Sequence, residues 1–373
     1  MKIARVETFI LHVPVTGGNI ADSMHAISHW GMPGAVVHTE DGRSGYGFAG
    51  THAHLPTDRL ITGFIAETAA PLLIGQSLDG TADVERLWST VYHFPPAQWV
   101  GRSGITHLGL AALDIALWDL IAKDAGVPLW RLLERRTDPP PLEAYDTDGG
   151  WLHLSEAQIV ANCRRAVEER GFHGVKIKVG KPDLAEDLRR VAAVRRAVGP
   201  EVKFMVDANG KWDLGTALAA DPFLAEHDVF WVEEPLWYDD LEAHRRLAEA
   251  ARVPIALGEQ LYSEYDFRNF IGAGAVGFVQ PDVTRLGGIS EWLRVADRAH
   301  EAGLPVAAHA GDMAQIHVQT CLAHPACAIL EHIPWTRDCF EEPMTVRDGV
   351  FVRPEAPGAG TTFRPGILER YGR

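Results

Sequence analysis

The sequence predicts an α/β fold, a (β/α)8-type (modified TIM) barrel preceded by an N-terminal α+β capping domain. After residue 141, short apolar runs alternate with charged amphipathic stretches at intervals of roughly 25–30 residues, a pattern typical of parallel βα units. Eight such units can close into a barrel, and an open doubly wound sheet is the alternative. The eight runs are Leu142–Tyr145, Gly174–Lys178, Val202–Val206, Val229–Val232, Pro254–Leu257, Val276–Val279, Pro305–Ala308 and Ala326–Leu330.

The first part of the chain has a mixed α and β pattern. Lys2–His12 and Gly34–Thr39 read as strands of an antiparallel sheet. Ile105–Lys123 carries apolar residues at helical spacing. The proline-rich segment 137–141 then indicates a boundary, because proline fixes φ and removes a hydrogen-bond donor. We expect a capping domain at residues 1–140, a barrel at 141–342, and a C-terminal segment at 343–373 that returns to the capping domain.

Composition narrows the class of partner. Lys and Arg number 35 against 50 Asp and Glu, a formal net charge of −15 in 373 residues, whereas a nucleic-acid or anionic-membrane partner calls for a basic face. The four cysteines lack metal-binding spacing and are too sparse for a disulfide scaffold. The N-terminus lacks the apolar core of a signal peptide. We therefore expect a cytoplasmic protein with a small-molecule partner and neither nucleic acid nor membrane.

Three carboxylates end consecutive apolar runs. Asp207, Glu233 and Glu259 are separated by 26 residues each, which is the period of the βα units. Neighbouring barrel strands would bring them together at one rim, where hard oxygen ligands suit Mg²⁺. The alternative is that these acids merely cap the following helices. Glu234 competes with Glu233, and the spacing favours Glu233.

Two lysines end the second run. Alternation places Lys176 and Lys178 on one face of a strand, and in a barrel that face points inward. Mutual repulsion is expected to lower the pKa of at least one of them toward neutrality, as a general base requires. Lysines pointing outward from an edge strand are the alternative.

The sixth, seventh and eighth runs end in Asp282, His309 and Glu331. Neighbouring strands would set Asp282 against His309, orienting the imidazole and raising its pKa so that it can carry a proton. A single histidine among 17 is more often structural, and His309 stands out because it continues the series of strand ends. Bases on both sides of a cation predict removal of a proton α to a carboxylate, with the metal stabilising the enediolate.

With these motifs the chain resembles the enolase superfamily, in its mandelate racemase subgroup, over essentially its whole length. The resemblance implies Mg²⁺ on Asp207, Glu233 and Glu259. It implies Lys178 and His309 as acid–base residues, with Lys176 tuning Lys178 and Asp282 pairing with His309. It also implies that Glu331 donates a hydrogen bond to a substrate carboxylate. The matching motifs are Asp114–Asp119, Val175–Gly180, Val206–Asn209, Val232–Pro235, Gly258–Glu259, Gln280–Asp282 and His309.

Within the subgroup, the chain is most similar to acid-sugar dehydratases of the talarate/galactarate type, through Tyr145–His153, Val100–Gly104, Gly287–Ser290 and Glu331–His332. The likeness implies a Mg²⁺-dependent dehydratase of an aldonate or aldarate that yields a 2-keto-3-deoxy acid, and a homo-oligomer. The residues expected to bind the substrate are Asn209, Tyr145, Thr147, His25 and Trp30.

Two other functions remain open at this point. A racemase, epimerase or cycloisomerase would use the same lysine and histidine without loss of water. A non-catalytic regulatory or binding protein on the same fold would not need the full set of acid, base and metal residues. One departure from the dehydratase pattern follows His309, where the sequence reads Ala310-Gly311-Asp312-Met313.

Overall fold

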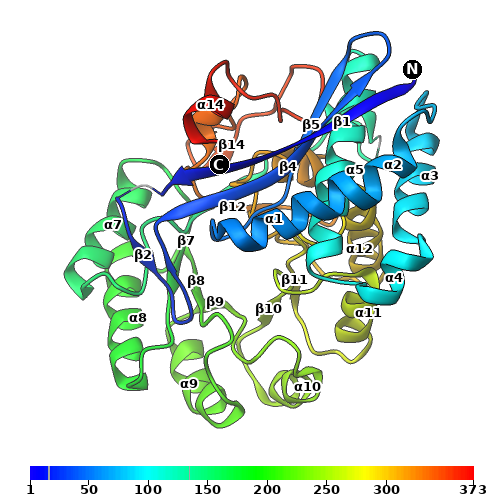
Figure 1. The fold of residues 1–373 in the computed structure, drawn as a ribbon. Helices are drawn as coiled ribbons and strands as arrows, with labels where there is room; N and C mark the ends of the chain where they lie inside the picture. The colour runs from blue at the N-terminus through cyan, green and yellow to red at the C-terminus, as the bar shows by residue number, and fades with distance from the viewer. Residues whose placement is uncertain (16, 134) are drawn as a thin grey trace.

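The capping domain is built on an antiparallel sheet. The computed structural model describes residues 1–15, 17–133 and 135–373. Strands β1 (Ile3–Pro14), β4 (His29–Thr39) and β5 (Ser44–Phe48) pair in the order β1-β4-β5. The short strands β2 (Ile20–Ala21) and β3 (Ala26–Ile27) form a separate hairpin over the barrel (Figure 1).

Helix α5 (Ile105–Asp124) is the centre of the capping domain. It packs on β4, β5 and a barrel helix, so it is buried almost all round rather than along one stripe. Its length and apolarity would let it cross a membrane, but 89% of its most apolar window is buried in the fold, as in a core helix. The other capping helices are α1 (Leu55–Gly63), a π-helical turn (Phe64–Ala69), α2 (Ala70–Leu73), α3 (Thr81–Tyr92), α4 (Pro95–Val100) and α6 (Leu129–Leu132).

The predicted barrel is confirmed, and the open sheet is excluded. The parallel strands follow one another in space in chain order, and β12 pairs with β6 to close the ring. The seventh run contributes a single residue, Val306, which bridges Val279 and Cys327. The strands are β6 (Glu143–Asp146), β7 (Gly174–Lys178), β8 (Lys203–Asp207), β9 (Val229–Glu233), β10 (Ile255–Leu257), β11 (Phe278–Val279) and β12 (Ile329–His332).

Helices surround the barrel, and several begin at a side-chain cap. Asp213, Asp240 and Ser263 cap the helices that follow β8, β9 and β10. The three strand-end carboxylates are therefore not needed as caps, which removes the simpler explanation for their spacing. The helices are α7 (Glu156–Glu168), α8 (Leu184–Val198), α9 (Leu214–Glu226), α10 (Leu241–Ala250), α11 (Glu264–Gly272), α12 (Ile289–Glu301) and α13 (His317–Ala323).

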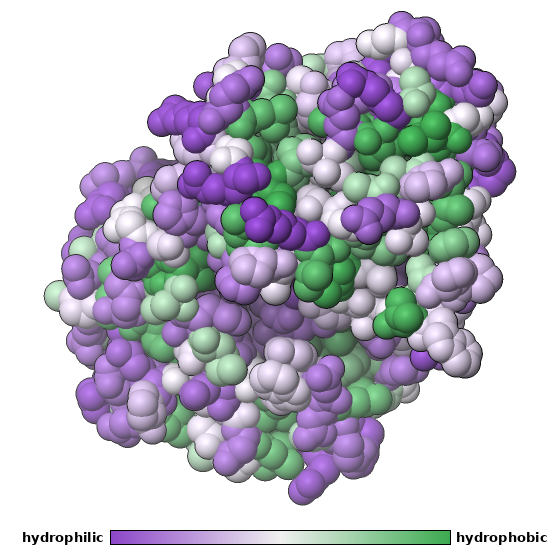
Figure 2. Space-filling model, viewed as in Figure 1, coloured by the Kyte–Doolittle hydropathy of each residue, from purple (hydrophilic) through white to green (hydrophobic). Residues whose placement is uncertain are grey.

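The C-terminal segment divides between the two halves. After a 3-10 turn (Arg337–Cys339), β13 (Val346–Arg347) and β14 (Val350–Phe351) form a hairpin that pairs with β6. The hairpin joins the barrel because the start of β6 still offers free backbone groups there. Helix α14 (Ile367–Tyr371) then lies near β1, and the N–H of Arg373 donates to the carbonyl of Ile10 (Figure 1). Figure 2 shows hydrophilic side chains spread over the same face, with apolar groups interspersed.

Candidate active site

The three strand-end carboxylates meet at the rim of the barrel. Asp207 and Glu233 are paired neighbours on β8 and β9, and Glu259 follows β10. One oxygen of each lies within 4.8 Å of the others, and all three side chains are buried. This arrangement follows from the parallel strands, whose carboxyl ends lie side by side. Glu234 is not part of the group.

The triad fits a small divalent cation. Its donors are all carboxylate oxygens, as Mg²⁺ prefers. Burial, together with the charges of Asp207 and Glu331, raises the pKa of Glu233 to about 7 despite the opposing charge of Lys176, and a bound divalent cation would favour its ionised form. Two further buried oxygens beside the triad, Asn209 Oδ1 and Glu234 Oε1, have no hydrogen-bond partner among the described residues.

Lys176 and Lys178 point into the barrel, as alternation along β7 predicts, and both are buried. Lys178 Nζ lies 2.5 Å from Asp207 Oδ2, and Lys176 pairs with Glu233 and, at 2.9 Å, with Glu331. The expected fall in a lysine pKa is wrong for this state. Burial and mutual repulsion favour it, but the neighbouring carboxylates outweigh them and raise the pKa of both lysines.

His309 lies on the opposite flank of the triad. Its Nδ1 is 2.6 Å from Asp282 Oδ2, and its Nε2 is 3.1 Å from Glu259 Oε2. Thr284 fixes Asp282 by donating its backbone N–H and its hydroxyl to Oδ1. Burial alone would lower the pKa of His309, but Glu259 and Asp282 raise it to about 9, in the predicted direction. Both carboxylates therefore favour the protonated imidazole.

Glu331 lies in the interior beside Lys176 and accepts hydrogen bonds. Thr147 Oγ1 donates to its Oε1 at 2.6 Å, and the N–H of Ala310 donates to its Oε2 at 3.2 Å. The resemblance implied a protonated, donating carboxyl. Burial does favour that form, but the charges of Lys176 and His309 lower the pKa of Glu331, which is ionised here.

The residues expected to bind the substrate lie at different depths. Tyr145 packs against apolar side chains of the barrel interior with its ring 5.6 Å from Lys176 Nζ, and its hydroxyl has no hydrogen-bond partner among the described residues. Asn209 is beside the triad with a free amide oxygen. His25 pairs with Asp22 at 3.0 Å in the β2–β3 loop, and the indole N–H of Trp30 donates to Gly311 O at 3.0 Å. Substrate contact by these side chains stays a prediction.

Gln280 and Trp151 support the site, although the sequence motifs that contain them predicted no role for either residue. Gln280 Nε2 donates to Glu233 Oε2 at 2.8 Å, and Lys178 Nζ lies 5.5 Å from the centre of the Trp151 ring. Gln280 ends the sixth run on the inward face, so its position in the strand was the available signal.

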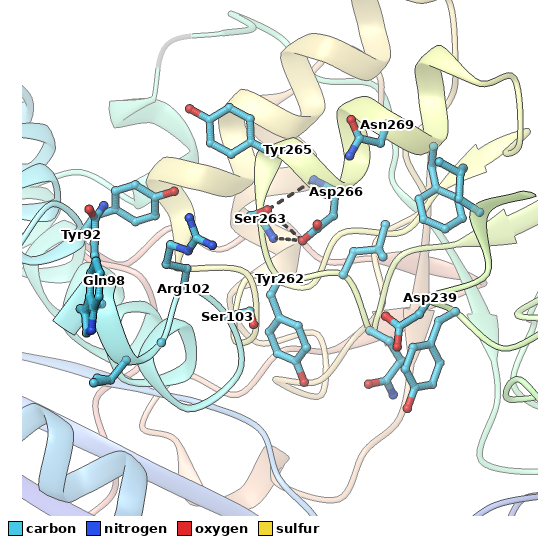
Figure 3. Close-up of a pocket in the computed structure, with 18 of the residues that line it drawn as sticks. Tyr92, Gln98, Arg102, Ser103, Asp239, Tyr262, Ser263, Tyr265, Asp266 and Asn269 are labelled. Carbon is cyan, nitrogen blue, oxygen red and sulfur yellow. Dashed lines mark hydrogen bonds between the residues drawn. The ribbon is translucent and has the colours of Figure 1, made fainter. Parts of the chain in front are cut away.

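A cavity of about 1270 Å³ lies between the capping helices α3 and α4 and helix α11 (Figure 3). Gln260 and Tyr262 line it directly after Glu259, and both bind the guanidinium of Arg285. Figure 3 shows Ser263 and Asp266 joined by the hydrogen bonds that begin α11. The cavity thus adjoins the loop that carries the third carboxylate.

Comparison with known proteins places the chain in a family. Residues 5–134 match the N-terminal domain of mandelate racemase and muconate lactonizing enzyme, and residues 158–367 match the enolase C-terminal domain-like family. L-talarate/galactarate dehydratase from Salmonella typhimurium is 36% identical over 88% of this chain and 79% of its own length. A 3,6-anhydro-alpha-L-galactonate cycloisomerase from Streptomyces coelicolor is 31% identical over 100% of this chain and 99% of its own length.

A solved structure agrees over the whole chain. L-talarate dehydratase from Polaromonas sp. JS666, complexed with Mg and L-glucarate, superposes with a TM-score of 0.89 at 33% identity, covering 100% of this chain and 97% of its own. The resemblance stated from the motifs is thereby confirmed. The chain belongs to the mandelate racemase/muconate lactonizing enzyme family of the enolase superfamily.

Proposed function

We propose that the protein is a Mg²⁺-dependent dehydratase of a sugar acid, an aldonate or an aldarate. The observation that carries the proposal is the placing of two proton-transfer groups on the two outer carboxylates of the triad. Lys178 contacts Asp207, and His309 contacts Glu259. A carboxylate held at the middle of the triad would have one group on each side of its α-carbon.

The chain's residues divide the reaction between them. A Mg²⁺ ion on the triad would stabilise negative charge on the substrate carboxylate as the α-proton leaves. His309, whose protonated form its hydrogen bond to Asp282 favours, is suited to donate its proton to the departing β-hydroxyl, which leaves as water. Lys178 faces it as the group that would take the α-proton, which requires its neutral form. A Mg²⁺ ion bound to Asp207 would favour that form, because it would offset the carboxylate charge that raises the pKa of Lys178. The resulting enol then tautomerises to the 2-keto-3-deoxy acid.

The relatives support this class and one alternative. The Salmonella relative is named as a talarate/galactarate dehydratase, and the Polaromonas structure holds Mg and L-glucarate. The Streptomyces relative is named as a cycloisomerase at similar identity. A cycloisomerase or racemase would use the same lysine and histidine without releasing water, and is the second candidate.

Incubation with a panel of aldonates and aldarates in D₂O, with and without Mg²⁺, separates these functions. A dehydratase produces 2-keto acid from at least one substrate, only with metal, and not with His309→Asn. Deuterium at the α-carbon without keto acid would instead indicate a racemase, and an isomeric product a cycloisomerase. No reaction with any panel member would contradict the proposal.

We further propose a cytoplasmic homo-oligomer. The four cysteines are free and buried, which suits a reducing compartment. Trp99 and Val100 on α4 are 91% and 82% exposed, as is common for side chains that a second subunit covers. Sedimentation velocity of the wild type and a Trp99→Ser, Val100→Ser variant tests the oligomer; a wild-type monomer would contradict it.

A further inference from the structure

The segment that follows His309 holds two of the predicted catalytic acids through its backbone. The N–H of Ala310 donates to Glu331 Oε2 at 3.2 Å, and the N–H of Gly311 donates to Asp282 Oδ2 at 3.1 Å. That Asp282 oxygen also binds His309 Nδ1 at 2.6 Å. The direction of both carboxylates, and of the imidazole, therefore depends on how residues 310 and 311 are held.

This segment has an unfavourable backbone conformation. Met313 and Ala314 have φ of 57° and 66°, in the left-handed region that non-glycine residues rarely adopt. At Gly311 a Cβ atom would lie 2.1 Å from Asp282 Oδ2, so the close approach requires glycine. Consecutive left-handed residues persist only where neighbouring groups hold them.

Asp312 supplies that support. Its buried carboxylate accepts the N–H groups of Ala314 and His317, each at 2.8 Å, and that of Ile316. Its Oδ1 also binds His317 Nδ1 at 2.6 Å. The Asp312 side chain therefore closes the turn and holds the backbone of Ala310 and Gly311, which precede it.

His317 connects this turn to the strand end that carries Asp282. The N–H of Val283 donates to His317 Nε2 at 2.8 Å, so Nε2 is an acceptor and the ring proton lies on Nδ1, donated to Asp312. His317 Nε2 is 3.8 Å from Asp282 Oδ1. The Asp312–His317 pair, fully buried, therefore joins the segment after His309 to the segment after β11.

The capping domain reaches the same turn. The indole N–H of Trp30 on β4 donates to the carbonyl of Gly311, whose N–H binds Asp282. Gly50 also packs closely here, because a Cβ atom on it would lie 2.5 Å from the same carbonyl. The turn is thus held from the barrel by Asp312 and His317, and from the cap by Trp30.

We propose that Asp312 and His317 are positioning residues for the His309–Asp282 dyad. They hold the turn at 310–314 and the start of the loop after β11. In this way they fix the backbone N–H of Gly311 and the carboxylate of Asp282, which orients the His309 imidazole. The inference rests on the proposed function only for the statement that His309 transfers a proton. Its structural content can be tested without any substrate.

The test compares Asp312→Asn, His317→Leu and His317→Gln with a matched control, Asp297→Asn. Asp297 Oδ1 lies 3.1 Å from His324 Nε2, so the control breaks an acid–histidine contact at the other end of α13. The first measurement is the far-downfield proton resonance of His309 Nδ1–H in Mg²⁺-loaded protein, assigned by its loss in His309→Asn. We expect Asp312→Asn and His317→Leu to shift or remove it, and the control to leave it unchanged.

Turnover gives the second measurement. Misplacing a proton-transfer group by about 1 Å costs on the order of 10²-fold, so we expect kcat to fall by that order in Asp312→Asn and His317→Leu with little change in KM. His317→Gln keeps a donor and an acceptor and should recover part of the loss. Circular dichroism confirms that each variant folds, and Asp312→Asn decides the test if His317→Leu does not fold.

An unchanged His309 resonance in folded Asp312→Asn would overturn the inference, whatever the activity, and so would an unchanged resonance in folded His317→Leu. If the wild type turns over no sugar acid but the resonance still moves as expected, the proposed function fails and the positioning role stands.

Discussion

Two of the clusters of buried acids and bases in the described part of the chain differ in whether burial removes their charges. One is the barrel rim, where Asp282 faces His309 at 2.6 Å. The other is the contact between the capping helix α5 and the barrel helix α12. There Asp114 accepts the N–H and hydroxyl of Ser290 at 2.9 and 2.7 Å, and His107 Nε2 stands 3.9 Å from Glu291 Oε2.

At the interface between the domains, burial removes the charges. It raises the pKa of Glu291 to about 8 and that of Asp114 to about 7, and lowers the pKa of His107 to about 4. In the dyad at the rim, close opposite charge outweighs burial. Glu259 and Asp282 raise the pKa of His309 to about 9, and His309 lowers that of Asp282 to about 2, whereas burial still raises the pKa of Glu233 to about 7. A perturbed pKa alone therefore does not identify a functional site. Charge retained in a buried place is a stronger indication, because it costs stability unless close partners compensate it.

The largest expected effect is at the metal ligands of the rim. Glu259→Gln removes one of three charged donors, and we expect Mg²⁺ affinity to fall by more than about 100-fold, the upper range for losing a mere outer-shell partner. Isothermal titration calorimetry measures it. Asp297→Asn is the control, because Asp297 pairs with Arg135 and His324 and not with any residue of the triad. Equal losses in the two variants would show that the ligand set is wrong.

The next effect concerns the two flanks of the triad. Lys178→Ala and His309→Asn should each lower kcat by about 10²–10⁴-fold, the usual range for general acid–base groups, with a smaller change in KM. Steady-state kinetics on the substrate found in the panel gives both numbers. Near-native turnover in either variant would remove that residue from its proposed role.

Much of the rim could be predicted from the sequence, because strand periodicity places side chains. The spacing of Asp207, Glu233 and Glu259 follows from the repeat of the βα unit. The common direction of Lys176 and Lys178 follows from the two-residue alternation of side chains along a strand. The three carboxylates meet at the rim, and both lysines are buried on β7, as these two periods predict.

What could not be predicted depends on distances between elements. The pKa of each lysine is set by carboxylates from other strands, which a single strand does not reveal. Tyr145 is at a strand end, yet its large ring fills the barrel interior. The turn after His309 has left-handed residues without glycine at 313 and 314, for which no local sequence signal exists.

A smaller fall in kcat is expected when the uncharged hydrogen-bond donor at the rim, the Thr147 hydroxyl, is removed. Thr147→Val removes the hydroxyl that donates to Glu331 at 2.6 Å, and a hydrogen bond to a charged group contributes about 1.5–3 kcal/mol. Only part of that reaches the transition state, so we expect kcat to fall by about tenfold, equivalent to about 1.4 kcal/mol.

Thr336→Val is the matched control for this prediction. Thr336 is buried, and its hydroxyl has no hydrogen-bond partner among the described residues, so valine should leave kcat unchanged and melting temperature unchanged or higher. A fall in kcat no larger in Thr147→Val than in Thr336→Val would show that the Glu331 contact does not matter for turnover.

A substitution of Glu291 at the domain interface should have the smallest effect on activity. It should instead change how the stability of the protein depends on pH. Glutamate in an unfolded chain has a pKa of about 4.3, whereas burial raises that of Glu291 to about 8. The folded protein thus keeps a proton that the unfolded chain loses between about pH 4 and 8. Its stabilising contribution is full below that window and is lost as pH rises through it.

Glu291→Gln keeps the shape and the acceptor for the N–H of Glu264 but cannot ionise. Its gain in melting temperature over the wild type should grow between pH 5 and pH 8, reaching about 1–4 °C, with kcat unchanged. His107 acts in the opposite direction, since its lowered pKa makes folding less favourable as pH falls, but it does so in both proteins. The difference between the two therefore isolates the glutamate, and thermal melts at both pH values measure it. An equal gain at pH 5 and pH 8 would mean that Glu291 is ionised in the folded protein, and that the interface holds charge as the rim does.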